Sequence, residues 1–355
     1  MPAQSVLPGP TGSGAVNTAS ATRPAAAFLL PPDMFELVYG EECLKAVGAQ
    51  STLLADRPLG PHEPHRDWID LLGEVEAIFT GWHSPRLDAN LLSRLPRLRA
   101  VFHGGGTVRP LVTAGFWERG ITISTAAAAN AVPVAEFTLG AILLSLKQAW
   151  ILNRRACRER AFPATFPRVA GVHGSTVGLV SLGLIGREVL RLLRPFDVRI
   201  IAHDPHLPAG RFQELGVESV TLEDLMARSD VVSLHTPLNA ATTGFIGGPL
   251  LRRLKHGATL INTARGGLLR EPELITFLRE RTDVQAVLDV TFPEPPPVDS
   301  PLYDLPNVFL TPHIAGSLGP ECRRLGWSMV EEFKRFVKGE PLQHALSREA
   351  AEAQT

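Results

Sequence analysis

Residues 175–186 of the chain read Ser-Thr-Val-Gly-Leu-Val-Ser-Leu-Gly-Leu-Ile-Gly, and Asp204 follows after a further apolar stretch. This order predicts a strand, a tight turn, a helix and a second strand that ends in an acid, which is the arrangement of a dinucleotide-binding site. Gly183 lets the backbone approach a pyrophosphate, and Gly186 lets the helix pack closely on the strand. The N–H groups of the helix N-terminus would face the phosphates, while Asp204 can accept hydrogen bonds from ribose hydroxyls. Ser181 departs from the pattern G-x-G-x-x-G, because it occupies the first glycine position.

The composition is that of a globular protein with two domains. A length of 355 residues exceeds the usual size of one domain, and the 45% of apolar residues can build sizeable cores. The formal net charge is −1 and no long basic run occurs, so we expect no nucleic acid and no membrane surface as a partner. Cys43, Cys157 and Cys322 are far apart in sequence. They favour a cytoplasmic location without disulfides. We expect no metal site, because the sequence contains no CxxC pair, no HExxH motif and no helix with paired histidines.

Two stretches resemble targeting or membrane segments but lack the features of one. Residues 1–24 are rich in Ala, Ser, Thr, Pro and Gly, with Arg23 as the one charged side chain. They lack a basic region followed by an apolar one, so we expect a disordered tail. The most hydrophobic stretch, residues 134–152, contains Glu136 and Lys147 and is predicted to form a buried helix.

Short apolar runs alternate with helical stretches, which predicts a parallel α/β architecture. Most of these runs show no polar alternation, as expected for strands that are covered on both faces. A first series of strands is expected at 25–30, 77–80, 98–102 and 121–124, with a helix over 87–95. A second series is expected at 177–182, 199–203, 231–235, 259–263, 286–290 and 308–310, followed by a terminal helix over 320–338.

Three segments of the second series each place an ionisable residue just after an apolar strand. They are Leu-Ile-Asn-Thr-Ala-Arg-Gly-Gly with Arg265, Val-Leu-Asp-Val-Thr-Phe-Pro-Glu-Pro with Glu294, and Val-Phe-Leu-Thr-Pro-His-Ile-Ala-Gly with His313. Because ligands bind at the carboxyl ends of strands in an open parallel sheet, we expect these three side chains to share a site.

Each of the three residues also has an ordinary structural interpretation. Arg265 could form an ion pair at a helix terminus, and Glu294 could be a solvated carboxylate in a proline-rich loop. His313 could be a structural histidine. Their order along the chain, each after a strand, favours a shared functional site over three separate structural roles.

These segments, with the dinucleotide pattern and Leu-His-Thr-Pro-Leu at 234–238, resemble the D-isomer-specific 2-hydroxyacid dehydrogenases over about residues 98–336. The resemblance implies a Rossmann dinucleotide-binding domain inserted in a split, flavodoxin-like substrate domain. It places the NAD-binding domain at residues 131–316 and the substrate domain at residues 25–130 and 317–355. It also implies a homodimer built largely on the Rossmann domain.

The resemblance assigns catalytic roles that the chemistry of the side chains supports. Arg265 would bind the carboxylate and carbonyl of the substrate, and Glu294 would partner His313. Hydride transfer to a 2-keto acid builds negative charge on the carbonyl oxygen, where a protonated His313 can donate its proton and take it back during oxidation. Glu294 would favour the imidazolium form and fix the orientation of the ring. We therefore expect an NAD(H)-dependent oxidoreductase that interconverts a small D-2-hydroxy acid and its 2-keto acid.

The resemblance also implies a glycine-rich loop that cradles the substrate carboxylate with backbone N–H groups. The matching loop is His-Gly-Gly-Gly-Thr-Val at 103–108, whose glycines permit close approach. The family commonly has an aspartate shortly after this loop, whereas Val-Arg-Pro stands here at 108–110. Asn130 is expected near the hinge between the domains. The predicted substrate-binding residues are Gly104, Gly105, Gly106, Thr107, Arg265 and His313.

Asp204 favours NAD over NADP as the cofactor. A carboxylate pairs with a ribose diol and repels a 2′-phosphate, and the following Pro-His-Leu supplies no arginine to hold one. His235 is a second candidate acid–base residue, but the resemblance places the catalytic pair elsewhere, so we assign it to the lining of the cofactor cleft. The predicted cofactor-binding residues are Ser181, Leu182, Gly183, Leu184, Ile185, Gly186, Asp204, His235, Thr236, Pro237, Thr263, Ala264 and Asp289.

Two other functions remain open at this point. Relatives of the family include transcriptional corepressors, so a non-enzymatic module that senses NAD(H) is one alternative. Phosphite dehydrogenase is another, whereas formate dehydrogenases of this superfamily place an amide where Glu294 lies. A phosphoglycerate dehydrogenase with a regulatory domain is disfavoured, because residues 339–355 are too few to form one.

Overall fold

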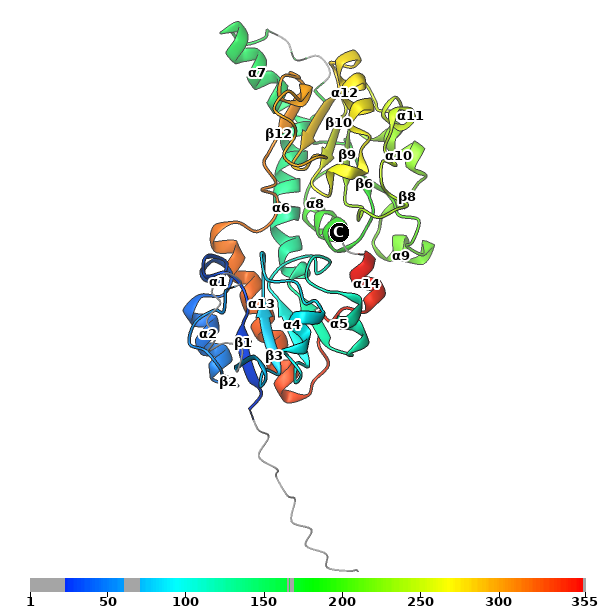
Figure 1. Ribbon diagram of the computed structural model, residues 1–355. Coiled ribbons are helices and arrows are strands. Elements are labelled where there is room, and N and C mark those ends of the chain that lie inside the picture. Colours follow the sequence, from blue (N-terminus) through cyan, green and yellow to red (C-terminus); the bar gives the residue numbers. More distant parts are fainter. Residues whose placement is uncertain (1–22, 61–70, 165, 167–168, 354–355) are drawn as a thin grey trace, which may run out of the picture.

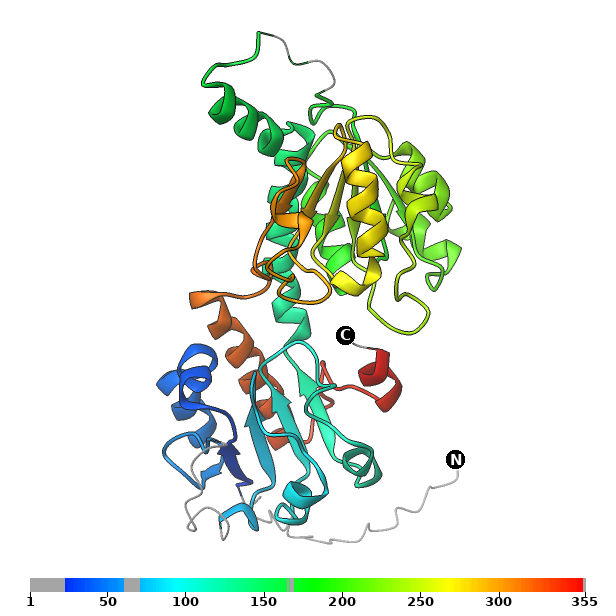
Figure 2. The same cartoon turned by 45° about the horizontal axis from the view of Figure 1, so that its top comes forward.

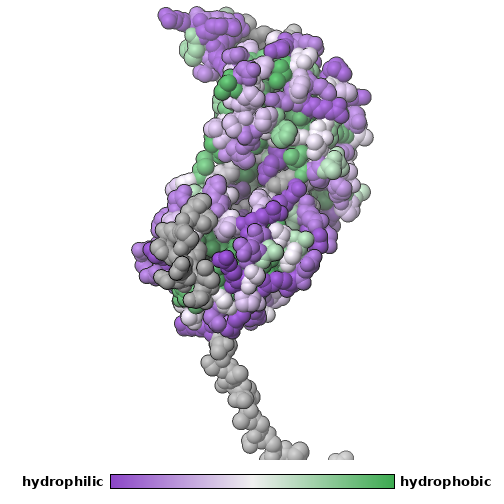
Figure 3. Space-filling view, in the orientation of Figure 1, coloured by the Kyte–Doolittle hydropathy of each residue, from purple (hydrophilic) through white to green (hydrophobic). Residues whose placement is uncertain are grey.

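The computed structural model describes residues 23–60, 71–164, 166 and 169–353. They form two parallel α/β units, one above the other in Figure 1, which the long helix α6 (Ala127–Leu146) connects. We call the unit built on strands β1 to β5 the first unit and the one built on β6 to β12 the second unit. The surface narrows to a waist between the two units in the space-filling view (Figure 3). The predicted tail lies outside the described residues, except for its last two positions.

The first unit contains a five-stranded parallel sheet in the order β2-β1-β3-β4-β5. This is the flavodoxin-like order, with helices on both faces of the sheet. One hydrophobic core lies between the sheet and helices α1, α2 and α13, and a second lies on the opposite face against α4, α5 and α14. The strands are β1 (Ala25–Phe28), β2 (Thr52–Leu53), β3 (Ala77–Thr80), β4 (Ala100–His103) and β5 (Thr122–Thr125). The helices are α1 (Pro32–Val38), α2 (Gly40–Gly48), α4 (Ala89–Ser93), α5 (Ala114–Glu118), α13 (Cys322–Lys338) and α14 (Arg348–Ala353).

A row of aromatic rings holds the C-terminal helix α13 against the first sheet. Phe28, Phe79 and Phe102 occupy paired positions on three neighbouring strands, so their rings lie on one face. The ring centroids of Phe28 and Phe79 are 4.6 Å apart, and those of Phe79 and Phe102 are 5.3 Å apart. Phe333 of α13 meets the last two rings edge-on. Both ribbon views show α13 along this sheet (Figures 1 and 2), so the end of the chain returns to the first unit.

The second unit contains a seven-stranded parallel sheet in the order β12-β11-β10-β9-β6-β7-β8. Counted from β6, the first six strands have the order of a Rossmann fold, which confirms the predicted fold class. The strands are β6 (Thr176–Val180), β7 (Arg199–His203), β8 (Glu218–Ser219), β9 (Val231–Leu234), β10 (Thr259–Asn262), β11 (Gln285–Leu288) and β12 (Val308–Leu310). The helices are α8 (Leu184–Leu193), α9 (Ala209–Glu214), α10 (Leu222–Arg228), α11 (Gly248–Leu251) and α12 (Glu271–Glu280), with short 3₁₀ helices η1 (Gly266–Leu268), η2 (Pro301–Tyr303) and η3 (Gly319–Glu321).

Helix α6 differs from the predicted helix over 134–152 at both ends. It begins at Ala127, includes Pro133, and ends before Gln148, whose φ of 50° lies in the left-handed region. The chain then turns into α7 (Ala149–Glu159), which extends away from the second sheet (Figure 1). Helix α6 is long and apolar enough to cross a membrane by length and composition alone, but it packs against α8, β9, β10 and α13. These contacts bury the helix only in part, since 39% of its most apolar window is buried, whereas the sequence predicted a buried helix.

The C-terminal segment is built into the first unit through a buried carboxylate. Residues 343–346 run antiparallel to β5, with a bridge between Ser124 and Ala345. The side chain of Glu332 on α13 is almost inaccessible, and it accepts hydrogen bonds from Ser124 Oγ at 2.6 Å, Gln343 N at 3.0 Å and His344 N at 2.9 Å. Glu332 therefore connects α13, β5 and the segment that leads to α14.

We predict that Glu332→Ala lowers the free energy of unfolding by about 2 kcal/mol, because it leaves buried hydrogen-bond donors without a partner. The neighbouring Glu331 forms an exposed ion pair with Lys334, so Glu331→Ala should change stability by less than about 0.5 kcal/mol. Urea unfolding of both variants tests this, and equal losses would show that the buried carboxylate has no special role.

Candidate active site

The turn between β6 and α8 has the geometry of a phosphate-binding site. A Cβ added to Gly186 would lie 2.2 Å from the carbonyl oxygen of Ser181, so only glycine allows the helix to approach the turn this closely. A Cβ at Gly183 would meet nothing within 4 Å, and no side chain caps α8 at this residue. The first N–H groups of α8 therefore face an open space that an anionic phosphate fits.

Ser181 adopts the conformation of the glycine that it replaces. Its φ of 76° lies in the left-handed region, which costs a non-glycine residue about 1–2 kcal/mol. In this position Ser181 Oγ lies 3.3 Å from Asp204 Oδ2, which also accepts a hydrogen bond from Leu182 N at 2.8 Å. The carboxylate of Asp204 is thus held beside the turn, at the rim of a cavity of about 600 Å³ that Pro205 and Thr221 also line. The contact of Asp204 with ribose hydroxyls stays a prediction.

The other predicted cofactor residues follow neighbouring strands at the same edge of the sheet. Residues 235–237 follow β9, and Thr263 and Ala264 follow β10. Thr263 Oγ1 lies 2.9 Å from Thr138 Oγ1 of α6, which ties this turn to the connecting helix. Both ring nitrogens of His235 are buried and have no hydrogen-bond partner among the described residues. Burial lowers the pKa of His235 to about 4, so the ring is neutral at neutral pH.

His313 and Glu294 form the predicted pair. Nδ1 of His313 lies 2.5 Å from Oε1 of Glu294, and the two side chains are 50% and 42% exposed. Since Nδ1 is engaged by the carboxylate, Nε2 is the ring nitrogen that can face a substrate. His313 has a φ of 54°, so the turn that presents it is held in a conformation that only a tightly bonded loop maintains.

Asp289 supplies those bonds. It is 2% exposed, and its carboxylate accepts hydrogen bonds from Thr311 Oγ1 at 2.6 Å, Ile314 N at 2.8 Å and Ala315 N at 3.0 Å. Its backbone carbonyl accepts a further bond from His313 N at 2.9 Å. The structure therefore shows Asp289 as the support of the His313 loop, and its contact with a cofactor stays a prediction.

Arg265 is half-buried at the end of the turn after β10. Asn262 shapes this turn, because its side chain donates to Arg265 O at 2.8 Å and accepts from Ala264 N at 3.1 Å. A Cβ at Gly266 would lie 2.0 Å from the backbone of Thr291, so glycine lets this turn touch the one that leads to Glu294. Burial lowers the pKa of Arg265, and the nearby charge of Glu294 opposes that shift. Sequence reasoning did not single out Asn262, although a buried amide at the end of an apolar strand was a visible signal.

The glycine-rich loop after β4 rests on two buried rings. A Cβ at Gly104 would lie 2.7 Å from Tyr39 Oη, and one at Gly105 would lie 2.5 Å from His103 Nε2. The His103 ring makes a hydrogen bond of 3.0 Å with Thr80 Oγ1 and another with the backbone of Thr107. Desolvation lowers the pKa of His103 to about 4, so the imidazole that packs against the loop is neutral at neutral pH.

Asn130 lies where the chain passes between the two units. It is in the first turns of α6, and its Oδ1 accepts a hydrogen bond from Ser317 N at 2.9 Å. The bond joins α6 to the segment that leads from His313 back to α13. The predicted boundary between residues 130 and 131 thus falls inside α6. Arg265, Glu294, His313 and the dinucleotide turn share the carboxyl edge of the second sheet, whereas residues 104–107 lie at that of the first. Among the described residues no group of histidine, cysteine and acidic side chains could hold a metal ion.

Comparisons with known proteins show the family and agree with the fold. Residues 140–315 match the family model described as "D-isomer specific 2-hydroxyacid dehydrogenase, NAD binding domain". The chain is 35% identical to the (S)-sulfolactate dehydrogenase of Chromohalobacter salexigens over 257 residues, which cover 71% of this chain and 82% of that protein. Among solved structures it is similar to a phosphoglycerate oxidoreductase from Rhizobium etli, with a TM-score of 0.76, 26% identity and coverage of 92% and 99% of the two chains.

Other relatives are longer than this chain. It is 29% identical to the D-3-phosphoglycerate dehydrogenase of Archaeoglobus fulgidus over 262 residues, which cover 74% of this chain and 50% of that protein. The chain therefore spans about half the length of this relative.

We predict that Gly266→Ala impairs both folding and turnover, because its Cβ has no space beside Thr291. The free energy of unfolding should fall by about 1–3 kcal/mol, and kcat/KM should fall at least about tenfold as Arg265 and Glu294 move apart. Gly140 on α6 has nothing within 4 Å of an added Cβ, so Gly140→Ala is the matched control and should be neutral or slightly stabilising. Normal kinetics in Gly266→Ala would contradict the proposed close contact.

We predict that His103 makes the protein less stable in mild acid. The pKa of its ring is about 4 in the folded protein and 6.5 in the unfolded chain, so between these values the unfolded chain binds the proton first. The free energy of unfolding should fall as pH drops through this window, by up to about 1.4 kcal/mol per pH unit for this group. Urea unfolding from pH 7 to 4.5 should show a smaller slope for His103→Gln. Identical slopes would mean that His103 does not titrate in this way.

Proposed function

The chain belongs to the D-isomer specific 2-hydroxyacid dehydrogenases, a family of NAD-dependent oxidoreductases, and we propose that it interconverts a small D-2-hydroxy acid and its 2-keto acid. The observation that supports this most is the contact of His313 with Glu294 at the edge of the dinucleotide-binding sheet. Such a pair is what reversible proton transfer to a carbonyl oxygen requires. Intact catalytic groups favour an enzyme over a module that senses the nucleotide.

The cofactor would be held at the edge of the second sheet. The N-terminal N–H groups of α8 suit the pyrophosphate, and Asp204 suits the ribose hydroxyls. The buried ring of His235 has polar atoms that lack a partner in the part of the chain that the structure describes. When bound there, NADH supplies the hydride that reduces the carbonyl carbon of the keto acid.

His313 and Glu294 would carry the accompanying proton. His313 in its protonated form donates the proton from Nε2 to the carbonyl oxygen as negative charge builds there, and in the oxidation direction it takes the proton back. The carboxylate of Glu294 on Nδ1 stabilises the imidazolium and prevents rotation of the ring. Asp289 keeps the backbone of His313 in place throughout, since it bonds the loop on both sides of the histidine.

Arg265 and the glycine-rich loop would orient the substrate. The guanidinium fork of Arg265 fits a carboxylate or a carboxylate and carbonyl together, which a lysine cannot match. Backbone N–H groups of residues 104–107 would bind the same carboxylate from the first unit. Substrate would then bridge the two units, and closure about the Asn130 connection would exclude water from the reacting atoms. The relatives named for sulfolactate and phosphoglycerate act on acids of this small size.

We also propose a cytoplasmic homodimer formed through the second unit. The described cysteines are all free, which suits a reducing compartment. Helix α7 has no buried residue in the single chain, and the segment after it exposes 92% of Phe162. A large exposed ring beside a helix without a buried residue is typical of a surface that a second copy covers.

We predict that His313→Ala lowers kcat by about 10²–10⁴-fold while NADH still binds. Loss of the proton donor affects chemistry, whereas the dinucleotide turn is untouched. Fluorescence titration of NADH and stopped-flow oxidation of NADH with a keto acid measure the two properties separately. His206 lies on the exposed surface, so His206→Ala serves as the control and should keep full turnover. Unchanged kcat in His313→Ala would rule out the proposed mechanism.

We predict that the wild-type protein has twice the mass of one chain in light scattering after size exclusion, and that Phe162→Asp shifts it toward the monomer. The aspartate would bury a charge at the proposed interface, and the free energy of desolvation would exceed the free energy gained from dimer contacts. Val298 is fully exposed elsewhere on the second unit, so Val298→Asp should leave the dimer intact. A monomeric wild-type protein would disprove the interface.

A further inference from the structure

The proposed mechanism gives no role to the buried imidazole of His103, the last residue of β4. The residue is 4% exposed, and its ring lies against the glycine-rich loop that is proposed to bind the substrate carboxylate. Nδ1 of the ring lies 3.0 Å from Oγ1 of Thr80, which ends the neighbouring strand β3. Burying a polar ring costs free energy unless it is hydrogen-bonded, so its placement directly beside this loop calls for an explanation.

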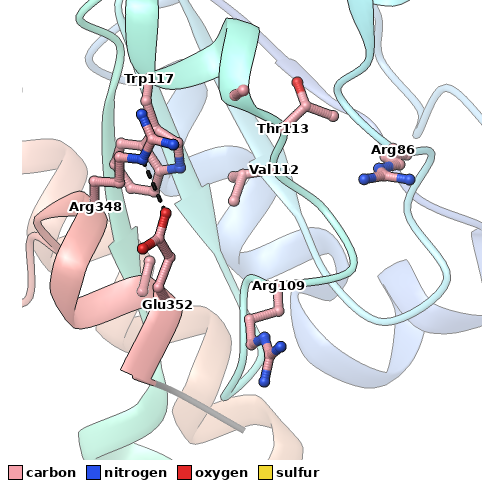
Figure 4. A pocket seen from close by; sticks show the side chains of 9 residues that line it. Arg86, Arg109, Val112, Thr113, Trp117, Arg348 and Glu352 are labelled. Atoms are coloured by element: carbon pink, nitrogen blue, oxygen red, sulfur yellow. Dashed lines mark hydrogen bonds and ion pairs between the residues drawn. The ribbon is translucent and has the colours of Figure 1, made fainter. Parts of the chain in front are cut away.

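Contacts other than those of the His103 ring hold the two ends of the loop. At the first end, the N–H of Gly104 donates to the carbonyl oxygen of Thr80 at 2.8 Å. At the other end, Val108 is fully buried in the hydrophobic core on the face of α5 and α14. The chain then continues past Arg109, which lies across from α14 (Figure 4). Only the three residues between these two anchors are left for the ring to fix.

These three residues, Gly105, Gly106 and Thr107, form a cradle of backbone N–H groups. Their N–H groups donate to no acceptor within the part of the chain that the structure describes. Adjacent N–H groups of this kind make a concave site that suits an anion. A Cβ added to Gly106 would meet only Asn130 Nδ2 within 4 Å, at 3.9 Å, so the space there is open. A Cβ added to Gly105 would lie 2.5 Å from Nε2 of His103, so the ring fills the space at that residue.

The His103 ring joins the start of the cradle to its end. The ring hydrogen-bonds the backbone of Thr107, four residues along the chain. The carbonyl oxygens of His103 and Gly105 both accept from the N–H of Ala126, at 3.0 and 3.1 Å. Glycine has more backbone freedom than any other residue, and these bonds remove that freedom from the cradle. The orientation of its N–H groups is therefore set before a ligand arrives.

We propose that His103 is a positioning residue for substrate binding, because its buried ring preorganises the cradle for the carboxylate of a 2-keto acid. The inference rests on the proposed function, which supplies that carboxylate. Ordering a free backbone costs about 1–2 kcal/mol per residue, and a cradle that is ordered in advance spares the ligand this cost. The carboxylate keeps its charge during hydride transfer, so the cradle binds ground state and transition state alike. His103 should therefore act on KM and leave kcat unchanged.

Oxamate tests the cradle without turnover, because it has the carboxylate and carbonyl of a keto acid but accepts no hydride. We expect calorimetric titration to show oxamate binding to the full-length wild-type protein saturated with NADH. His103→Leu removes both bonds of the ring, and Thr80→Val removes the partner of Nδ1. Each variant should bind oxamate about tenfold more weakly, as expected for loss of a buried hydrogen bond. Binding of NADH, measured by fluorescence, should not change, because the dinucleotide turn lies in the second unit.

Two further variants separate positioning from a general loss of stability. His103→Gln keeps a donor and an acceptor, so oxamate binding should return close to that of the wild type. Val47→Ala removes buried volume at the end of α2, where the chain leads back to the start of β2. It should lower stability and leave oxamate binding unchanged. Oxamate binding in His103→Leu equal to that of the wild type, or the same loss in Val47→Ala, would overturn the proposal.

Steady-state kinetics on a keto acid that the wild type reduces give the second measurement. KM for the keto acid should rise about tenfold in His103→Leu, with kcat within about twofold of the wild type. A fall in kcat at unchanged KM would contradict the role of His103. A wild-type protein that binds NADH but not oxamate would also contradict it. Binding of NADH and oxamate without turnover of any keto acid would contradict the proposed function instead, and the loss of oxamate binding in His103→Leu would still support the role of His103.

Discussion

The active-site edge depends on the hydrogen bonds that the buried carboxylate of Asp289 accepts from residues 311–315. They hold His313 in a left-handed backbone conformation that costs a non-glycine residue about 1–2 kcal/mol and that an isolated loop would abandon. In that conformation the ring of His313 meets Glu294 on the neighbouring turn. The acid at the end of β11 is therefore a positioning group, and the acid–base chemistry belongs to the pair that it supports.

The two parallel sheets explain why residues from distant segments converge. In each sheet the predicted catalytic and ligand-binding residues follow the carboxyl ends of strands, where backbone N–H groups and helix N-termini also lie. Close packing of the turns then decides which side chains meet, because Gly266 touches Thr291 and Gly186 touches Ser181. Helix α6 and the Asn130–Ser317 hydrogen bond connect the two units. A substrate bound between the two sheet edges would therefore contact both units.

Most of the fold and the active-site pair follow from the sequence, since buried parallel strands are apolar runs and a polar residue after such a run is visible. The strands β2 and β8 were missed because they are two-residue edge strands without a fully buried side chain. The break between α6 and α7 was not predicted, because the residue with a left-handed backbone conformation at this position is Gln148 and not a glycine. In the sequence, Glu332 cannot be distinguished from a surface acid such as its neighbour Glu331. It becomes buried only when the C-terminal segment folds over it.

The most direct test of the central claim is NADH oxidation by the wild-type protein across a panel of 2-keto acids, with NADPH as the comparison. The panel includes glyoxylate, hydroxypyruvate, pyruvate, phenylpyruvate and branched-chain keto acids. The account predicts turnover of at least one of them, faster with NADH than with NADPH because Asp204 repels a 2′-phosphate. Binding of NADH without turnover of any keto acid would contradict it and would favour a role as a nucleotide sensor.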